Sequence, residues 1–256
     1  MTKSYPVLAG PPLAIAHRGG AWEQPQNSSL AFRRAVDLGY SFLETDVRAT
    51  RDGVAVVFHD AVLDRATDVE GRIRDLTWGQ VSQARIHGRS PILRLTELLS
   101  EFPATRFNLD IKESNAIDPF LDVIRTHNAW NRINVAAFAH ERLRRVRRMA
   151  GPRLSSSMSP QEVLAFRMHM RGRLRRWSPP PVSCVQIPEH VAGRLLAEPR
   201  LISAAHEHGW QVHVWTVDDR ETMNRLLDMG VDAIMTDRPT LLRDVLIARG
   251  QWTQAA

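Results

Sequence analysis

The segments that decide the fold lie between residues 16 and 60: AHRGG at residues 16–20, LETDV at residues 43–47 and VFHD at residues 57–60. Each contains or follows a short apolar run whose last residues turn polar, which is typical of buried strands. Together they place two histidines, an arginine and several carboxylates near strand ends. This concentration of reactive side chains predicts a site at one edge of a sheet.

Within the second segment, Glu44 and Asp46 are two residues apart. Residues two apart in a strand point to the same face, so these carboxylates project side by side. Neighbouring acids repel each other unless a positive charge lies between them, and a divalent cation can supply that charge. The alternative is a pair of solvated acids at a strand end, and these two residues alone do not decide between the interpretations.

The chain has 256 residues and a mass of 29.0 kDa, enough for one large domain or two small ones. Its 43% hydrophobic and 24% charged residues are ordinary for a globular protein. No apolar run has the length of a membrane-spanning helix, and Pro6, Pro11 and Pro12 interrupt any signal-peptide core, so we predict a cytoplasmic location. Cys184 is the only cysteine and lies in the apolar stretch 182–187, which predicts burial and excludes an intrachain disulfide.

The net charge of +6 and the pI near 10.5 would permit an acidic partner: a small phosphate compound, a nucleic acid or an anionic membrane. Nearly all of this positive charge is arginine, because Lys3 and Lys112 are the only lysines. Such a bias is typical of genomic base composition and is weak evidence for any partner. No recognition module is visible, so we predict no nucleic-acid partner, and the sequence makes no prediction of oligomeric state.

Strand-like and helix-like runs alternate along the rest of the chain. Strands are expected to begin near residues 13, 42, 106, 133, 154, 182, 211 and 233. Helices are expected at residues 27–38, 117–127, 141–149, 160–168, 195–208, 221–229 and 240–248. Eight strands, most of them followed by a helix, predict an α/β fold of the (β/α)8 TIM-barrel type in a single domain over residues 1–256, with a partly helical insertion at about 61–90 over the barrel mouth.

In such a barrel the carboxyl ends of the strands carry the active site. This rule brings together four of the residues above: His17, Glu44, Asp46 and His59. On the strand expected at residues 106–111, Asn108, Asp110 and Lys112 share one face, so a third carboxylate and a lysine enter the same mouth. Three oxygen-donating acids without a cysteine favour a hard cation, Mg²⁺ or Ca²⁺, over zinc.

The chain resembles the glycerophosphodiester phosphodiesterase family over nearly its whole length. The motifs that carry the resemblance stand in the family's order: HRG (17–19), residues 27–32, ETDV (44–47), DG (52–53), HD (59–60), Leu63, RAT (65–67), Gly71, DIK (110–112), WTV (215–217) and TDRP (236–239). The resemblance implies the same barrel fold. It also implies that the substrate is a small molecule, a glycerophosphodiester. The implied reaction is hydrolysis of this substrate to glycerol 3-phosphate and an alcohol.

The resemblance further implies roles for individual residues. The metal ligands would be Glu44, Asp46 and Asp110. The acid/base pair would be His17 and His59. The phosphate would be held by Arg18 and Lys112. Trp215, at a strand end, is either a wall for the glycerol moiety or ordinary barrel core, and Gln186 and Glu189 are weaker candidates for substrate contact that fit loop positions better.

Three positions depart from the family pattern: Gln26 and Asp110 stand where glutamates are usual, and Asp218 stands where asparagine is common. Gln26 removes a charge from the site, and Asp110 is one methylene shorter than glutamate. Both changes bear on metal affinity and preference. Neither removes an acid/base residue.

Two alternatives to this interpretation remain open. Arginines crowd the segments after the fourth and fifth expected strands: Arg142, Arg144, Arg145, Arg147, Arg148, Arg167, Arg171, Arg173, Arg175 and Arg176. With Met168, Met170 and Trp177 nearby, the second group could make a weak contact with an anionic membrane surface, as a lysophospholipase D acting on membrane lysophospholipids would, although a solvated face explains it more simply. The second alternative is a barrel that binds phosphodiesters without cleaving them, for which two histidines would be unnecessary.

Overall fold

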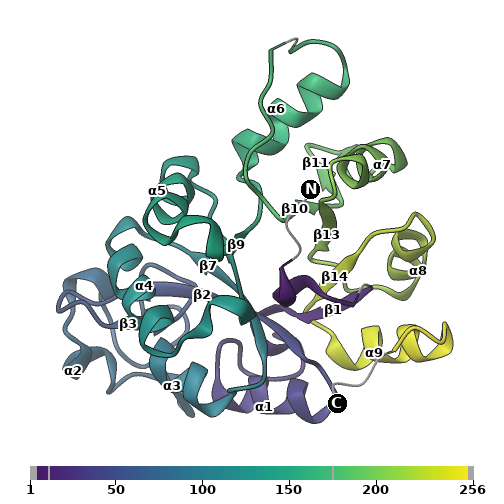
Figure 1. Ribbon diagram of the computed structural model, residues 1–256. Coiled ribbons are helices and arrows are strands. Elements are labelled where there is room, and N and C mark those ends of the chain that lie inside the picture. The colour runs from purple at the N-terminus through teal and green to yellow at the C-terminus, as the bar shows by residue number, and fades with distance from the viewer. Residues whose placement is uncertain (1–4, 11, 175, 253–256) are drawn as a thin grey trace.

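The computed structural model describes residues 5–10, 12–174 and 176–252, so Lys3, Pro11 and Arg175 lie outside the described residues. Within this part of the chain, eight parallel strands form a ring (Figure 1). They are β1 (Leu13–Ala16), β2 (Phe42–Ala49), β7 (Arg106–Ile111), β8 (Ile133–Ala136), β9 (Ser155–Ser156), β10 (Cys184–Pro188), β13 (Gln211–Trp215) and β14 (Ala233–Thr236). A parallel bridge between Ser157 and Cys184 joins β9 to β10. The predicted (β/α)8 barrel is confirmed.

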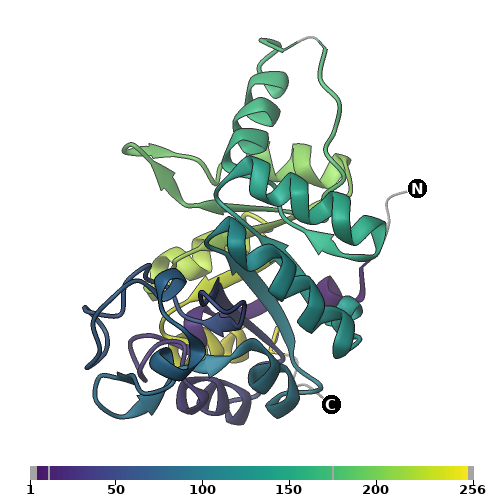
Figure 2. The ribbon, with the colours of Figure 1, turned by 90° about the vertical axis from the view of Figure 1, so that its left-hand side faces the viewer.

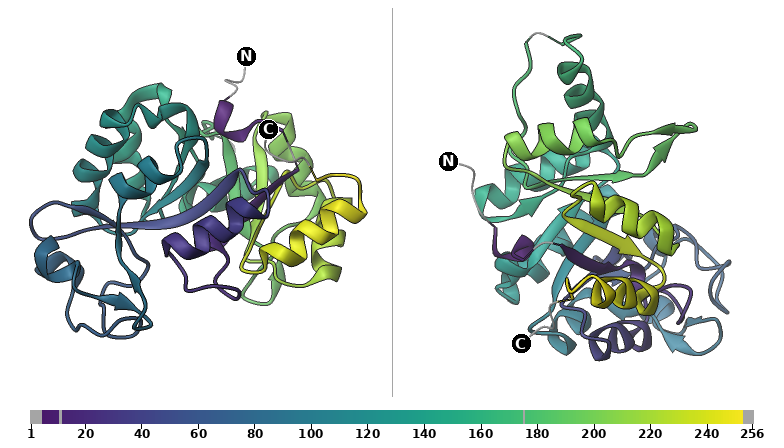
Figure 3. Two further views of the ribbon diagram at one scale, coloured as in Figure 1. Left: turned by 90° about the horizontal axis from the view of Figure 1, so that it is seen from below. Right: turned by 90° about the vertical axis from the view of Figure 1, so that its right-hand side faces the viewer.

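A helix follows each strand of the ring and packs on its outside (Figures 1 and 3). They are α1 (Ser29–Asp37), α3 (Leu95–Glu101), α4 (Ile117–Thr126), α5 (His140–Ala150), α6 (Pro160–Met170), α7 (Pro199–Glu207), α8 (Arg220–Asp228) and α9 (Pro239–Ala248). α1 begins as expected, because the Ser28 hydroxyl caps it by accepting a hydrogen bond from the Ala31 backbone N–H at 3.1 Å. The first and last helices, α1 and α9, lie side by side.

One predicted helix starts later than the sequence suggested. Residues 195–208 were expected to be helical throughout, but α7 begins only at Pro199. The preceding residues form a two-stranded hairpin of β11 (His190–Val191) and β12 (Arg194–Leu195). Ala192 and Gly193 between them both have positive φ angles, 49° and 72°, which is the geometry of a tight hairpin turn. The apolar residues at 195–196 had suggested a helical face that the turn excludes.

The insertion between β2 and α3 has a small core of its own, formed by Val56, Phe58, Leu63, Ile73 and Ile86 with their neighbours. Its elements are β3 (Ala55–Val57), α2 (Trp78–Val81), β4 (Arg85–Ile86), β5 (Ser90–Pro91) and β6 (Leu93–Arg94). β3 runs antiparallel to the end of β2. Figure 2 shows this insertion and the β11–β12 hairpin extending on the same side of the barrel. His59 follows β3, so the insertion positions this histidine at the mouth of the barrel.

The other end of the barrel is covered by the short helix η1 (Pro6–Leu8), whose Val7 and Leu8 pack in the same apolar cluster as Leu13 and Phe42. α6 and the segment after it project away from the ring of helices (Figures 1 and 2). No helix in residues 5–10, 12–174 and 176–252 is long and apolar enough to cross a membrane. Cys184 is buried, as predicted.

Candidate active site

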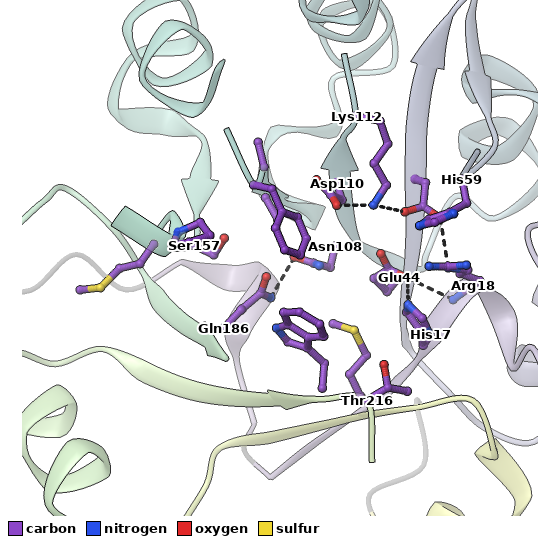
Figure 4. A pocket seen from close by; sticks show the side chains of 18 residues that line it. His17, Arg18, Glu44, His59, Asn108, Asp110, Lys112, Ser157, Gln186 and Thr216 are labelled. Carbon is purple, nitrogen blue, oxygen red and sulfur yellow. Dashed lines mark hydrogen bonds and ion pairs between the residues drawn. The ribbon is translucent and has the colours of Figure 1, made fainter. Parts of the chain in front are cut away.

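A pocket of about 250 Å³ opens at the carboxyl ends of the barrel strands (Figure 4). All eight site residues that the sequence predicted line it: His17, Arg18, Glu44, Asp46, His59, Asp110, Lys112 and Trp215. The rest of the lining is largely apolar and includes Ala136, Ala137, Phe138, Met158, Pro160, Trp215 and Met235. The rings of Phe138 and Trp215 meet edge to face at 5.7 Å. The pocket therefore joins a charged wall to a hydrophobic one.

His17 is held from behind by a carboxylate. Its Nδ1 lies 2.7 Å from Asp237 Oδ1, and its Nε2 lies 3.7 Å from Glu44 Oε2. Burial lowers the pKa of His17, but Glu44 and Asp237 outweigh this effect, so the net shift is upward. The turn that carries His17 needs glycine next to it, because Gly19 has a φ of 81° and a Cβ there would lie 2.7 Å from Ala31 Cβ.

His59 has a similar arrangement. Its Nδ1 lies 2.6 Å from Asp60 Oδ1, and Arg65 Nε donates a hydrogen bond to Asp60 Oδ2 at 2.7 Å. The hydrogen bond from Arg65 holds the pKa of Asp60 at about 2, so this carboxylate is ionised at neutral pH. Burial lowers the pKa of His59, and the nearby Asp46 and Asp60 offset only part of that shift. In both histidines the carboxylate occupies Nδ1 and leaves Nε2 for other partners.

The buried acids are neutralised by two cations. Lys112 Nζ lies 2.8 Å from Asp46 Oδ1 and 2.6 Å from Asp110 Oδ2, while Arg18 Nε lies 3.3 Å from Asp46 Oδ2 (Figure 4). Burial raises the pKa of Asp46, but Lys112 and Arg18 outweigh it and the net shift is downward. Glu44 is less well compensated, and burial raises its pKa to about 7. The charged wall therefore holds one carboxylate that lacks a sufficient positive partner.

Two observations bear on whether these residues fit a divalent cation. Across the described residues, no three His, Cys, Asp or Glu side chains already enclose a point as metal ligands do. However, Asp110 Oδ1 is buried without a hydrogen-bond partner, and the pKa of Glu44 is raised by burial as expected of an acid short of positive charge. The oxygen-only set of Glu44, Asp46 and Asp110 suits a hard cation. The residues therefore fit such an ion.

The departures from the family pattern have visible roles. Gln26 Oε1 accepts a hydrogen bond from Arg18 Nη1 at 2.7 Å, so the neutral side chain still orients this guanidinium. Asp218 Oδ1 accepts hydrogen bonds from Thr236 Oγ1 at 2.9 Å and from the Asp237 backbone N–H at 2.8 Å. Asp218 therefore supports the loop that presents Asp237 to His17.

Sequence reasoning missed several residues of the site. Asp237 lay inside a quoted motif but was given no role. Asn27 lay inside the quoted segment 27–32 and was also given no role in the site, but it is buried and donates a hydrogen bond from Nδ2 to Asp46 Oδ2 at 3.0 Å. Gln186 lines the pocket instead of lying in a loop, whereas Glu189 does not line it and bonds to Arg225. The signal that could have found Gln186 is its position as a polar residue between Val185 and Ile187 of an otherwise apolar strand, as Glu44 is a polar residue within an apolar strand.

The fold and the pocket define a TIM-barrel protein with a charged site at the carboxyl ends of its strands. The sequence profile of the glycerophosphoryl diester phosphodiesterase family matches residues 17–241, and the chain belongs to this family. It is 42% identical over 247 residues, 95% of this chain and 94% of the other, to a Mycobacterium tuberculosis protein named "Probable glycerophosphodiester phosphodiesterase 2". The chain is therefore an enzyme, a glycerophosphodiester phosphodiesterase.

Two further relatives broaden this comparison. A human lysophospholipase D, GDPD1, is 29% identical over 270 residues, which cover 91% of this chain and 85% of the human protein. The solved structure of an Oleispira antarctica phosphodiesterase in complex with its product sn-glycerol-3-phosphate matches with a TM-score of 0.74 and 22% identity, covering 93% of this chain and 97% of that one. The second likeness supports the barrel fold.

Proposed function

We propose that this enzyme releases glycerol 3-phosphate and an alcohol from glycerophosphodiesters, using His17 and His59 as its acid/base pair and a bound divalent cation. The observation that carries the proposal is that each histidine has its Nδ1 held by a carboxylate and lines the same pocket as two cationic side chains. A pocket that only binds phosphate needs cations but no oriented proton donors and acceptors, so we do not retain the non-catalytic alternative.

The two histidines can exchange protons at Nε2. Asp237 and Asp60 each fix the Nδ1–H tautomer and the ring orientation, which is the function of the carboxylate in other histidine-dependent hydrolases. One imidazole removes a proton from the attacking hydroxyl while the other donates a proton to the leaving alcohol oxygen. A positioned acid or base of this kind contributes roughly 10²- to 10⁴-fold to the rate.

Arg18 and Lys112 would hold the phosphate. Both lie against Asp46, with nitrogen atoms 3.3 and 2.8 Å from its oxygens, so their positive charges face one region of the pocket. The guanidinium of Arg18 can bind two phosphate oxygens at once, whereas Lys112 acts as a compact point charge. Glu44, Asp46 and Asp110 would hold Mg²⁺ or Ca²⁺, and the bound ion would supply polarisation of a phosphoryl oxygen.

The apolar wall would receive the uncharged part of the substrate. Trp215 and Phe138 present aromatic surface in the same pocket as the charged residues, with Lys112 Nζ 5.7 Å from the centre of the Phe138 ring, and this surface suits a carbon skeleton attached to the phosphate. The product complex of the Oleispira antarctica protein supports glycerol 3-phosphate as the product here.

The test is release of glycerol 3-phosphate from glycerophosphocholine and glycerophosphoethanolamine in the presence of EDTA, Mg²⁺ or Ca²⁺. We expect cation-dependent release by the unmodified chain and a loss of at least about 100-fold for His17→Ala and for His59→Ala. His206→Ala is the matched control, because His206 also lies 2.7 Å from a carboxylate, that of Asp232, but does not line the pocket. Full activity of either pocket variant would overturn the acid/base assignment.

A second candidate substrate is a lysophospholipid at a membrane surface. The apolar wall extends to Phe138, which is 58% exposed, and the projecting α6 exposes Leu164 and Met168 by 60% and 38%. Exposed arginines, among them Arg171 and Arg173, follow on the same projection. An apolar surface next to basic residues is suited to an anionic lipid surface. The human relative is named as a lysophospholipase D.

Sedimentation with vesicles that contain an anionic phospholipid tests this candidate. We expect binding at low salt that weakens as salt is added, together with choline release from lysophosphatidylcholine. Leu164→Glu should weaken the binding, whereas Ile247→Glu on α9, where Ile247 is 47% exposed, should not. No sedimentation at low salt would exclude the surface contact.

A further inference from the structure

A chain of polar side chains crosses the barrel from the pocket to the opposite end. Gln186 Nε2 lies 3.2 Å from His213 Nδ1, and His213 Nε2 lies 3.0 Å from Gln211 Oε1. Gln211 Nε2 then donates a hydrogen bond to the Leu8 backbone carbonyl at 2.8 Å. Gln186 lines the pocket, whereas Leu8 belongs to the helix that covers the far end. Because each side chain in this hydrogen-bonded series is fixed by its neighbour, the series determines how the Gln186 amide is oriented.

The direction of the hydrogen bonds follows from the far end. A carbonyl can only accept, so Gln211 must present its nitrogen to Leu8 and its oxygen to His213. No acidic side chain among the described residues contacts His213, which is completely buried, and burial lowers its pKa to about 3, so it is neutral. Its single proton is therefore on Nε2, and its Nδ1 can only accept. Gln186 must accordingly direct its amide nitrogen at His213.

The second N–H of Gln186 is also used inside the protein. It donates to Asn108 Oδ1 at 3.0 Å (Figure 4). The same oxygen accepts a hydrogen bond from Asn134 Nδ2 at 2.7 Å. Asn108 is thereby fixed with its oxygen toward the barrel interior. Among the described residues, Gln186 Oε1 receives no hydrogen bond and Asn108 Nδ2 donates none, and neither atom is sealed from the pocket that both residues line. Two side chains of the pocket lining that contact each other therefore offer one free acceptor, on Gln186, and one free donor, on Asn108.

We propose that Gln186 Oε1 and Asn108 Nδ2 form a subsite for a free hydroxyl of the substrate's glycerol moiety. A hydroxyl can accept from Asn108 while it donates to Gln186, and so satisfies both atoms at once. A phosphate oxygen of the diester has no proton for Gln186, and the trimethylammonium group of choline has none either. In glycerophosphocholine these two residues thus select the glycerol side of the diester over the choline head group. This inference rests on the proposed function, because it takes a glycerophosphodiester as the substrate.

The subsite makes a quantitative prediction for binding. The recognised hydroxyl would make two neutral hydrogen bonds of about 0.5–1.5 kcal/mol each, so its loss should weaken binding by about 5- to 150-fold. The measurement is calorimetric titration with sn-glycerol 3-phosphate and with its two analogues that each lack one hydroxyl, propane-1,2-diol phosphate and propane-1,3-diol phosphate. Binding is the readout because an analogue without the attacking hydroxyl could be uncleavable for a separate reason.

We expect the unmodified chain to bind one analogue about 5- to 150-fold more weakly than sn-glycerol 3-phosphate. Gln186→Met should reduce this preference by weakening only the ligand that carries the recognised hydroxyl. Ser155→Ala is the control: Ser155 donates to Asn134 Oδ1 within the same interior network but does not line the pocket, so this variant should keep the preference. Equal binding of all three phosphates by the unmodified chain, or an unchanged preference in Gln186→Met, would overturn the subsite.

A crystal structure of the unmodified chain with sn-glycerol 3-phosphate provides a test that does not depend on folding of the variant. A glycerol hydroxyl within hydrogen-bond distance of both Gln186 and Asn108 supports the subsite, and a phosphate or water there contradicts it. Glycerophosphocholine hydrolysis is assayed in parallel. Hydrolysis without hydroxyl discrimination would reject the subsite alone, and discrimination without hydrolysis would reject the proposed function alone.

Discussion

Asp237→Asn is the substitution that most directly tests how the site orients its histidines. Asp237 lies 220 residues from His17 in the sequence, yet its Oδ1 is 2.7 Å from His17 Nδ1, and both side chains are largely buried. Asparagine retains the shape and can still present its oxygen, but it removes the negative charge. Its amide can also rotate to donate a hydrogen bond to Nδ1, which would place the imidazole proton on Nε2 and abolish proton acceptance there.

The magnitude follows from the geometry. A hydrogen bond to a charged group contributes about 1.5–3 kcal/mol, and each 1.36 kcal/mol of transition-state free energy corresponds to a tenfold change in rate. We therefore expect kcat for glycerophosphocholine to fall by about 10- to 150-fold, with a further loss if the wrong tautomer predominates. KM should change little, because Asp237 does not line the pocket. The assay is steady-state release of glycerol 3-phosphate at saturating cation.

A matched variant and a stability measurement separate orientation from misfolding. Asp60→Asn removes the corresponding partner of His59 and should give a comparable loss of kcat. The Asp237 backbone carbonyl accepts from Trp22 N–H at 3.2 Å, a contact that Asp237→Asn leaves intact, so its thermal unfolding should stay near that of the unmodified chain. A kcat within twofold of the unmodified value in Asp237→Asn would refute the orienting role.

Three further predictions concern the cation, one ion pair and one turn. Removal of divalent ions with EDTA should abolish hydrolysis, and Mg²⁺ or Ca²⁺ should restore it; undiminished activity in EDTA would contradict the cation proposal. Burial raises the pKa of Glu162, but Arg147, which contacts it at 2.6 Å, outweighs this and lowers the pKa below its usual value of 4.5. The pair should therefore contribute about 2 kcal/mol to the free energy of unfolding at pH 7. Urea unfolding should show that the difference in this free energy between the unmodified chain and Glu162→Gln becomes smaller as the pH falls below 4.5. A difference that stays constant with pH would disprove the linkage. Gly19→Ala should lower the melting temperature by several degrees more than Gly53→Ala. Both glycines have a positive φ, but only at Gly19 would the added Cβ lie 2.7 Å from Ala31 Cβ. Equal shifts in melting temperature would show that the structure around Gly19 moves to accept the added carbon at no cost.

The elements that the sequence predicted well are those whose pattern is local. The strand expected at residues 106–111 coincides with β7, because its alternation of polar and apolar side chains reflects one face turned to the site and one to the helices. The helix after the second strand, α3, was not predicted, since the insertion separates it from β2. The late start of α7 was also missed, because a positive φ at Ala192 leaves no mark in the hydrophobic pattern.

For the site, the amino-acid sequence by itself determined which chemical groups are present and that they stand at strand ends, since side-chain type and strand period are local properties. Only the tertiary structure decided which groups meet. Asp237 directly follows β14 and His17 directly follows β1, and these two strands become neighbours when the barrel closes. Gln186 and Asn108 meet across the barrel interior from β10 and β7, which are not adjacent in the ring. Such contacts depend on the closure of the whole ring, and no local run of residues encodes that closure.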